Sequence, residues 1–187
     1  MADHVCPPFV GRLLLSRLRK LVENPKKIFA PFVREGMVVL EPGCAMGFFT
    51  LPLARMVGSG GKVVAVDIQS DMLTALERRA RKNGLIDRID IRQADSNGLG
   101  IADLAKSVDF CTVFHVAHEV PDRDRFFGEV SQTLKPGGKL LLVEPGWHVS
   151  EEDFQKSLSA IESSGLRRTE SPEVQGARKA LFERSRE

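Results

Sequence analysis

Residues 37–49, MVVLEPGCAMGFF, carry the strongest structural signal in this chain of 187 residues. A short apolar run is followed at once by a turn that contains Gly43 and Gly47, and then by a segment of helical character up to residue 57. Glycine allows a tight turn and a close approach to the backbone, and the free N–H groups of the next helix face whatever binds there. The stretch therefore predicts a strand, a ligand-binding turn and a helix, although a bare tight turn fits the same residues.

Four further apolar runs follow the one at 37–41 and are similar to it in length. They are KVVAVD at 62–67, RIDIR at 88–92, VDFCTVF at 108–114 and KLLLVE at 139–144. The middles of four of these runs lack polar alternation, which is typical of strands buried on both faces of a parallel sheet. Crossover helices are predicted between the runs, at 47–57, 70–83, 100–106 and 121–134. Alternating strands and helices with right-handed crossovers predict an α/β fold with a doubly wound sheet.

The C-terminal part predicts one more helix and an antiparallel hairpin. Ser150-Glu151-Glu152-Asp153 resembles a capping box, and we expect a helix from there to about Ser164. GLRRTE and ARKALFERS then flank the turn-forming SPEVQG. The complete prediction is a mostly parallel, seven-stranded sheet with a C-terminal antiparallel hairpin.

The N-terminal part predicts two helices that precede the sheet. Residues 9–23 place apolar side chains on one stripe and charged ones away from it, which indicates an amphipathic helix. Asn24-Pro25 is a typical N-cap and first helical position for a second helix through about Phe32. We expect one compact domain, with a helical segment at 1–35 and the sheet domain at 36–187. The N-terminal helix is a candidate partial lid or a candidate homodimer contact.

Composition narrows the class of partner. Lys and Arg number 27 against 25 Asp and Glu, so a formal charge of +2 does not by itself indicate a nucleic-acid or membrane partner. The three cysteines are Cys6, Cys44 and Cys111; they form no CxxC pair, which favours a reducing compartment over a disulfide framework. We find neither a secretory signal nor an apolar run near the roughly 20 residues of a membrane span. These observations predict a cytoplasmic protein.

Acidic side chains follow the second and third predicted strands. Asp67 ends the second strand, where a carboxylate can accept hydrogen bonds from both hydroxyls of a ribose. Asp95 and Ser96 follow the third strand, and Asp95 can accept from an adenine amino group. Alternatives stay open: Asp67 also fits a helix N-terminal acid, and Asp95 fits a turn residue. Polar groups at successive strand ends predict an adenosine-bearing cofactor.

The glycine spacing distinguishes between two such cofactors. A dinucleotide fingerprint G-x-G-x-x-G starting at Gly43 requires glycine at the positions of Ala45 and Phe48, so NAD is not expected. Glu41, Gly43 and Gly47 instead resemble the E/D-x-G-x-G-x-G loop of class I methyltransferases that depend on S-adenosyl-L-methionine (SAM). Ala45 departs from that pattern, because the family usually has its middle glycine there.

The resemblance extends from about Asn24 to the end of the chain. Its motifs are VVLEPGCAMGFF, VVAVDIQSDML, IRQADS, DFCTVFHVAHEVPD and LKPGGKLLLVEP. The chain looks similar to the type 11 group, which includes the ubiquinone/menaquinone C-methyltransferases. The resemblance implies the Rossmann-like methyltransferase fold, SAM as cofactor and a small-molecule acceptor. The cofactor-binding residues that it implies are Glu41, Gly43, Ala45, Gly47, Asp67, Ile68, Met72, Asp95, Ser96, Phe114 and His115.

The segment after the fourth strand carries the candidate catalytic residues. It reads Phe114-His115-Val116-Ala117 and lacks the Asn/Asp-Pro-Pro-Tyr motif of family members that methylate base or glutamine amino groups. His118, with Glu119 second, is the candidate general base, since neutral histidine accepts a proton near pH 7. His118 also fits a residue that merely hydrogen-bonds a neighbouring loop. We expect no metal, because two histidines three residues apart lack the H-E-x-x-H geometry.

The sequence supports three functions. The first is a SAM-dependent methyltransferase with a small-molecule acceptor. The second is a module that binds or senses SAM without catalysis. The third is an RNA methyltransferase, for which residues 1–35 offer seven Lys or Arg against three Asp or Glu, without a recognisable RNA-binding module.

Overall fold

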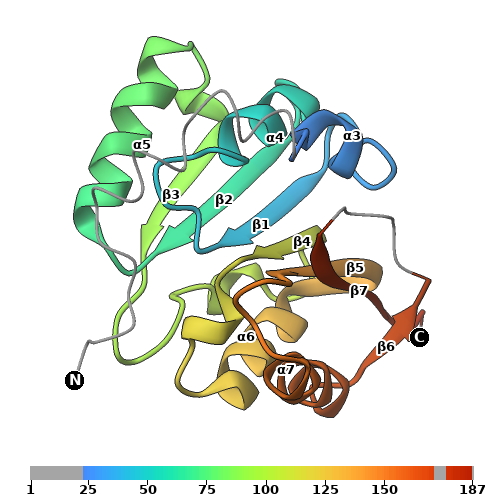
Figure 1. Ribbon diagram of the computed structural model, residues 1–187. Coiled ribbons are helices and arrows are strands. Elements are labelled where there is room, and N and C mark those ends of the chain that lie inside the picture. Colours follow the sequence, from blue (N-terminus) through green and yellow to red (C-terminus); the bar gives the residue numbers. More distant parts are fainter. Residues whose placement is uncertain (1–22, 171–175, 187) are drawn as a thin grey trace.

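The computed structural model describes residues 23–170 and 176–186. Residues 25–29 form helix α3, the first helix labelled in Figure 1. The amphipathic helix predicted for 9–23 lies outside the described residues apart from Glu23. The proposed boundary between residues 35 and 36 therefore stays a prediction.

One sheet of seven strands organises the described residues, in the order β3-β2-β1-β4-β5-β7-β6. The first five strands pair in parallel, whereas β7 pairs antiparallel with both β5 and β6. This confirms the predicted doubly wound, mostly parallel sheet with its terminal hairpin. The strands are β1 (Val38–Pro42), β2 (Lys62–Asp67), β3 (Ile89–Gln93), β4 (Val108–Phe114), β5 (Leu134–Pro145), β6 (Leu166–Thr169) and β7 (Ala177–Arg184).

Helices cover both faces of the sheet. Helices α3, α4 and α5 lie over one face, and α6 and α7 over the other (Figure 1). Each face buries its own apolar cluster against the β-branched strands, as expected for strands without polar alternation. The helices are α3 (Pro25–Phe29), α4 (Thr50–Met56), α5 (Ser70–Lys82), α6 (Arg123–Thr133) and α7 (Glu151–Ser163), with 3₁₀ turns η1 (Ile86–Arg88), η2 (Ala102–Leu104) and η3 (Ala117–Glu119).

Side-chain caps fix where three of these helices begin. Asn24 accepts from the N–H groups of residues 26 and 27 and starts α3 before Pro25. Ser150 accepts from the N–H of Asp153 at the start of α7, and Asp122 accepts from the N–H of Arg125 in α6. Each cap satisfies an N–H that has no partner inside its helix. The caps predicted at Asn24 and Ser150 are confirmed.

Two sequence predictions differ from the structure. The crossover helix predicted at 100–106 is wrong, because only the single turn η2 forms there. Gly100 (φ +66°) and Lys106 (φ +52°) both adopt left-handed backbone, so the segment between them is too short for a regular helix. Strand β5 begins at Leu134 rather than at 139, with a register shift between Val108 and Phe110 on its partner strand.

Within residues 23–170 and 176–186, no helix is both long and apolar enough to cross a bilayer.

Candidate functional site

The parallel strands bring the predicted site residues to one edge of the sheet. Register pairs Pro42 with Val66, Asp67 with Gln93 and Phe114 with Val143. The residues that follow these strands therefore lie side by side in the order β3, β2, β1, β4 and β5. Strand order reverses between β1 and β4, and ligands of doubly wound sheets bind outside the strand ends at such a point.

The turn after β1 needs glycine for two reasons. Gly43 adopts φ +74°, and a Cβ built on it would lie 2.7 Å from Val116 Cγ2. Gly47 adopts φ +80°, and its Cβ would collide with Leu76 of α5. Left-handed backbone and close packing both disfavour larger residues at these two positions. Val116 follows β4, so this contact joins the turn after β1 to the loop after β4. It crosses the switch point, which is the place between β1 and β4 where strand order reverses.

Ala45 sits between these glycines in left-handed backbone, with φ +45°. Its N–H donates to Asp67 Oδ2 at 2.8 Å, and the N–H of Gln69 donates to Asp67 Oδ1 at 2.9 Å. Alanine thus adopts a left-handed conformation that glycine takes at less cost. One carboxylate holds the turn after β1 and the turn after β2 together.

Asp67 is largely buried, and burial raises its pKa above the ordinary value while the backbone hydrogen bonds oppose that shift. An ionised carboxylate has about four acceptor positions, and the backbone N–H groups of Gln69, Ala45 and Ile68 do not use all of them. Ile68 beside it is 55% exposed, a large apolar side chain open at the strand end, and Met72 is buried in the first turn of α5. An acceptor pair next to an apolar face fits a ribose and its adenine.

The predicted residues nearer to β4 have different surroundings. Glu41 is buried near the end of β1. Phe114 packs against Phe29 and Phe49, with ring centroids 5.7 and 4.5 Å apart, so it belongs to an aromatic cluster as well as to the strand end. His115 adopts φ +58°, and its Nε2 lies 3.3 Å from Glu23 Oε1.

At the end of β3, Asp95 forms a local turn. Its Oδ1 accepts from the N–H of Asn97 at 2.7 Å, and its backbone bridges to Gly98. The Ser96 carbonyl accepts from Arg125 of α6, and both Asp95 and Ser96 are exposed. The alternative considered for Asp95, a turn residue, is thus realised, while an adenine contact stays a prediction.

The candidate base His118 is part of a hydrogen-bonded pair. Its Nδ1 lies 2.7 Å from Glu144 Oε2, and its backbone N–H donates to Glu144 Oε1 at 3.2 Å. Glu144 is near the end of β5 and is fully buried. The hydrogen bond to this carboxylate raises the pKa of His118, against the lowering effects of burial and Arg123. Nε2, at the other side of the ring, is 3.9 Å from Glu119 Oε1.

A hollow of about 270 Å³ lies at this pair, near the lower limit of roughly 300 Å³ for ligand pockets. Arg123 joins η3 to α7 beside this hollow, since its Nε donates to the Ala117 carbonyl and its Nη1 to the Asp153 carbonyl. The hollow is therefore built between η3 and the start of α7, on the β4–β5 side of the switch point. Its lining residues are His118, Glu119, His148, Val149 and Asp153.

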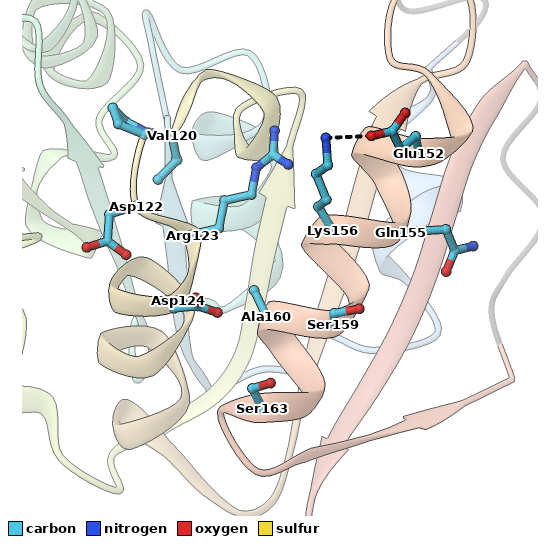
Figure 2. Close-up of a pocket in the computed structure, with 11 residues that line it drawn as sticks. Val120, Asp122, Arg123, Asp124, Glu152, Gln155, Lys156, Ser159, Ala160 and Ser163 are labelled. Atoms are coloured by element: carbon cyan, nitrogen blue, oxygen red, sulfur yellow. Dashed lines mark ion pairs between the residues drawn. The ribbon is translucent and has the colours of Figure 1, made fainter.

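A larger groove of about 1000 Å³ runs between α6 and α7 (Figure 2). Charged side chains line it, and Lys156 pairs there with Glu152 at 2.9 Å. None of the predicted cofactor-binding residues lines this groove, so it is not the candidate cofactor site.

In the part of the chain that the structure describes, no group of three or more His, Cys, Asp or Glu side chains is arranged to hold a metal ion.

Sequence reasoning missed two partnerships at this edge. Glu144 ends the fifth predicted strand and Val116 follows the fourth, but the sequence predicted neither the bond of Glu144 to His118 nor the contact of Val116 with Gly43. The signal for Glu144 was a single acid at the end of an apolar run, one strand away from His118. A buried acid needs a donor, and the nearest strand end supplies it.

Comparison with known proteins places this geometry among methyltransferases. Residues 33–176 match the family described as "Methyltransferase domain". A demethylmenaquinone methyltransferase of Lactobacillus johnsonii is 32% identical over 120 residues, which is 64% of this chain and 48% of that protein. A ubiquinone/menaquinone biosynthesis C-methyltransferase of Pectobacterium atrosepticum is 34% identical over 112 residues, 60% of this chain and 44% of that protein. The chain thus spans about half the length of these curated relatives.

A solved structure agrees over nearly the whole chain. A SAM-dependent methyltransferase from Aquifex aeolicus superposes with a TM-score of 0.83 and 24% identity, covering 96% of this chain and 98% of that one. At this level of identity the likeness shows the fold, and it confirms the predicted Rossmann-like arrangement.

Proposed function

This chain belongs to the methyltransferase domain family, and we propose that it is an enzyme that binds SAM and transfers its methyl group to a small-molecule acceptor. One observation carries the proposal. Asp67 at the end of β2 is hydrogen-bonded to the glycine-flanked turn after β1, beside the point where strand order reverses. An acceptor group for a ribose thus lies next to a turn that allows close approach of a ligand.

In this proposal the β1–β2–β3 side of the edge holds the cofactor. Asp67 accepts from the ribose hydroxyls, and Ile68 and Met72 contact the adenine faces. Asp95 and Ser96 lie at the adenine edge. The methionine part lies along the β1 turn and the β4 end, near Glu41, Gly43, Ala45, Gly47, Phe114 and His115.

The β4–β5 side holds the acceptor. Bound SAM supplies a methyl group on a positively charged sulfur. The protein contributes alignment of the acceptor and exclusion of water, together with a base if the attacking atom carries a proton. His118 lines the hollow and is the proposed base, and Glu119 is the second candidate. The volume of about 270 Å³ suits a small acceptor better than a macromolecule.

Calorimetric titration of the full chain with SAM, S-adenosylhomocysteine and NAD tests the cofactor. We expect micromolar dissociation constants for the first two and no heat with NAD. Heat with NAD and none with SAM would overturn the proposal. A second experiment incubates the protein with methyl-labelled SAM and cell extract, then identifies labelled products by mass spectrometry. Label in small molecules supports the enzyme, label in RNA supports the RNA methyltransferase, and binding without label transfer supports a SAM-sensing module.

We further propose a cytoplasmic location. The thiols of Cys44 and Cys111 are free and buried, which favours a reducing environment such as the cytoplasm. A homodimer contact through the N-terminal segment stays a prediction.

A further inference from the structure

Two strand ends supply an imidazole and a buried carboxylate to one hydrogen-bonded pair. Glu144 has no solvent-exposed surface, and both of its oxygens receive hydrogen bonds from His118, one from the ring and one from the backbone. The side chain of His118 is 17% exposed and lines the hollow. A buried carboxylate is costly without such donors, so the pair fixes the position of the histidine.

The hydrogen bond also determines which nitrogen carries the proton. A carboxylate only accepts, so Nδ1 must be the N–H donor in the bond of 2.7 Å to Glu144 Oε2. In neutral His118 the lone pair is then on Nε2. Nε2 lies on the side of Glu119, which lines the hollow together with His118. A carboxylate that fixes the tautomer and orientation of a histidine in this way is a common device in sites where the other nitrogen does the chemistry.

We propose that Glu144 is the positioning residue for His118 in the methyl transfer, and that the acceptor is therefore a molecule whose attacking atom carries a proton, such as a hydroxyl or amine. This inference rests on the proposed function. As the reaction proceeds, the bond between the attacking atom and the methyl carbon forms. The bond from that carbon to sulfur breaks with its electron pair going to sulfur, and the proton of the attacking atom moves to Nε2 of His118.

The charged groups around His118 suit that step. Glu144 of β5 faces Nδ1, Glu119 of η3 lies near Nε2, and Asp153 of α7 and His148 line the same hollow. Arg123 at the start of α6 carries a positive charge near His118, and this charge opposes protonation of the ring. The acidic groups stabilise the imidazolium that proton transfer would create. They also disfavour an acceptor with a carboxylate or phosphate at the attacking end.

Nitrogen-15 NMR of the histidine-labelled full chain tests the inference without any knowledge of the acceptor. The signal of His118 is assigned from its loss in His118→Asn. We expect the neutral ring of the wild type to carry its hydrogen on Nδ1. A neutral ring with its hydrogen on Nε2 would overturn the inference.

The matched variants Glu144→Gln and Glu119→Gln complete the test, because each removes one negative charge beside the same ring. We expect Glu144→Gln to lower the pKa of His118, and Glu119→Gln to lower it less and to leave the hydrogen on Nδ1. A larger change in Glu119→Gln would overturn the role of Glu144. Calorimetry with SAM on the same samples separates the two proposals. If the wild type does not bind SAM, the proposed function is refuted. If it binds SAM but the tautomer or the pKa changes differ from those expected, only the inference about Glu144 is refuted.

Discussion

The backbone N–H of Ala45 and the carboxylate of Asp67 are joined by a hydrogen bond of 2.8 Å that spans the ends of two neighbouring strands. Ala45 makes this bond in left-handed backbone, which costs an L-residue roughly 1–2 kcal/mol. The strain is therefore located where the proposed cofactor would bind. Asp67 has two functions in this arrangement, because the oxygens that order the turn are also those proposed to accept from the ribose.

We predict that Asp67→Ala weakens SAM binding by about 1.5–3 kcal/mol, the range for losing charge-assisted hydrogen bonds. Calorimetry measures the affinity, and circular dichroism checks that the variant folds. Asp71→Ala is the matched control, because Asp71 is an exposed acid in the first turn of α5. Unchanged affinity in a folded Asp67→Ala protein would remove Asp67 from the site, and an unfolded variant would make its role structural.

Ala45→Gly tests the strain in the same turn. Glycine relieves the left-handed conformation but adds conformational freedom to the unfolded chain, worth about 0.4–1 kcal/mol. We therefore expect a small net stabilisation, from about zero to 1 kcal/mol in urea denaturation, with SAM affinity kept or improved. Ala45→Val, whose β-branched side chain tolerates this backbone poorly, should instead lose more than about 1 kcal/mol. Loss of stability in Ala45→Gly would contradict the strained conformation of Ala45.

The sequence predicted most of the fold because strands that are buried on both faces consist almost entirely of apolar residues. The apolar runs at 62–67 and 108–114 coincide with β2 and β4, since strands covered on both faces have no polar positions to alternate. The segment at 100–106 was predicted wrongly for a local reason. Its ends at Gly100 and Lys106 take left-handed backbone, and the lysine gives no sign of this in the sequence.

The site was predicted in outline for a topological reason. Residues that follow parallel strands must meet at one edge, so the proximity of Asp67 to the β1 turn follows from their order along the chain. Contacts that depend on the direction of a side chain could not be predicted from the order of the strands. The Glu144–His118 bond joins residues 26 positions apart, and the Val116–Gly43 contact joins two loops. The residue pattern within a single helix or strand indicates neither of these two contacts.

Gly43→Ala tests the contact across the switch point, with Gly84→Ala as its matched control. Gly84 has a similar φ of +65° but nothing within 4 Å of its added Cβ, whereas at Gly43 that atom would lie 2.7 Å from Val116. Both variants should lose about 1–2 kcal/mol of stability from left-handed backbone. Gly43→Ala should lose about 1–3 kcal/mol more through overpacking.

Denaturant unfolding of both single variants measures this difference, and a double variant identifies its cause. We expect Val116→Ala in the Gly43→Ala background to recover part of the additional loss. Equal losses for Gly43→Ala and Gly84→Ala would show that the contact with Val116 carries no strain.

The His118–Glu144 pair predicts a specific pH dependence of stability. Because the pKa of His118 is raised in the folded protein, its protonated form contributes stability that is fully present below the ordinary value of about 6.5. This contribution is lost as the pH rises through the folded pKa. The free-energy difference between the wild type and His118→Asn should therefore be larger at pH 6 than at pH 9, as measured by urea denaturation. In a Glu144→Gln background the same comparison should show a weaker dependence on pH, because the largest cause of the raised pKa is gone. A difference that grows toward pH 9 would mean that His118 is held neutral, and it would contradict the geometry of the pair.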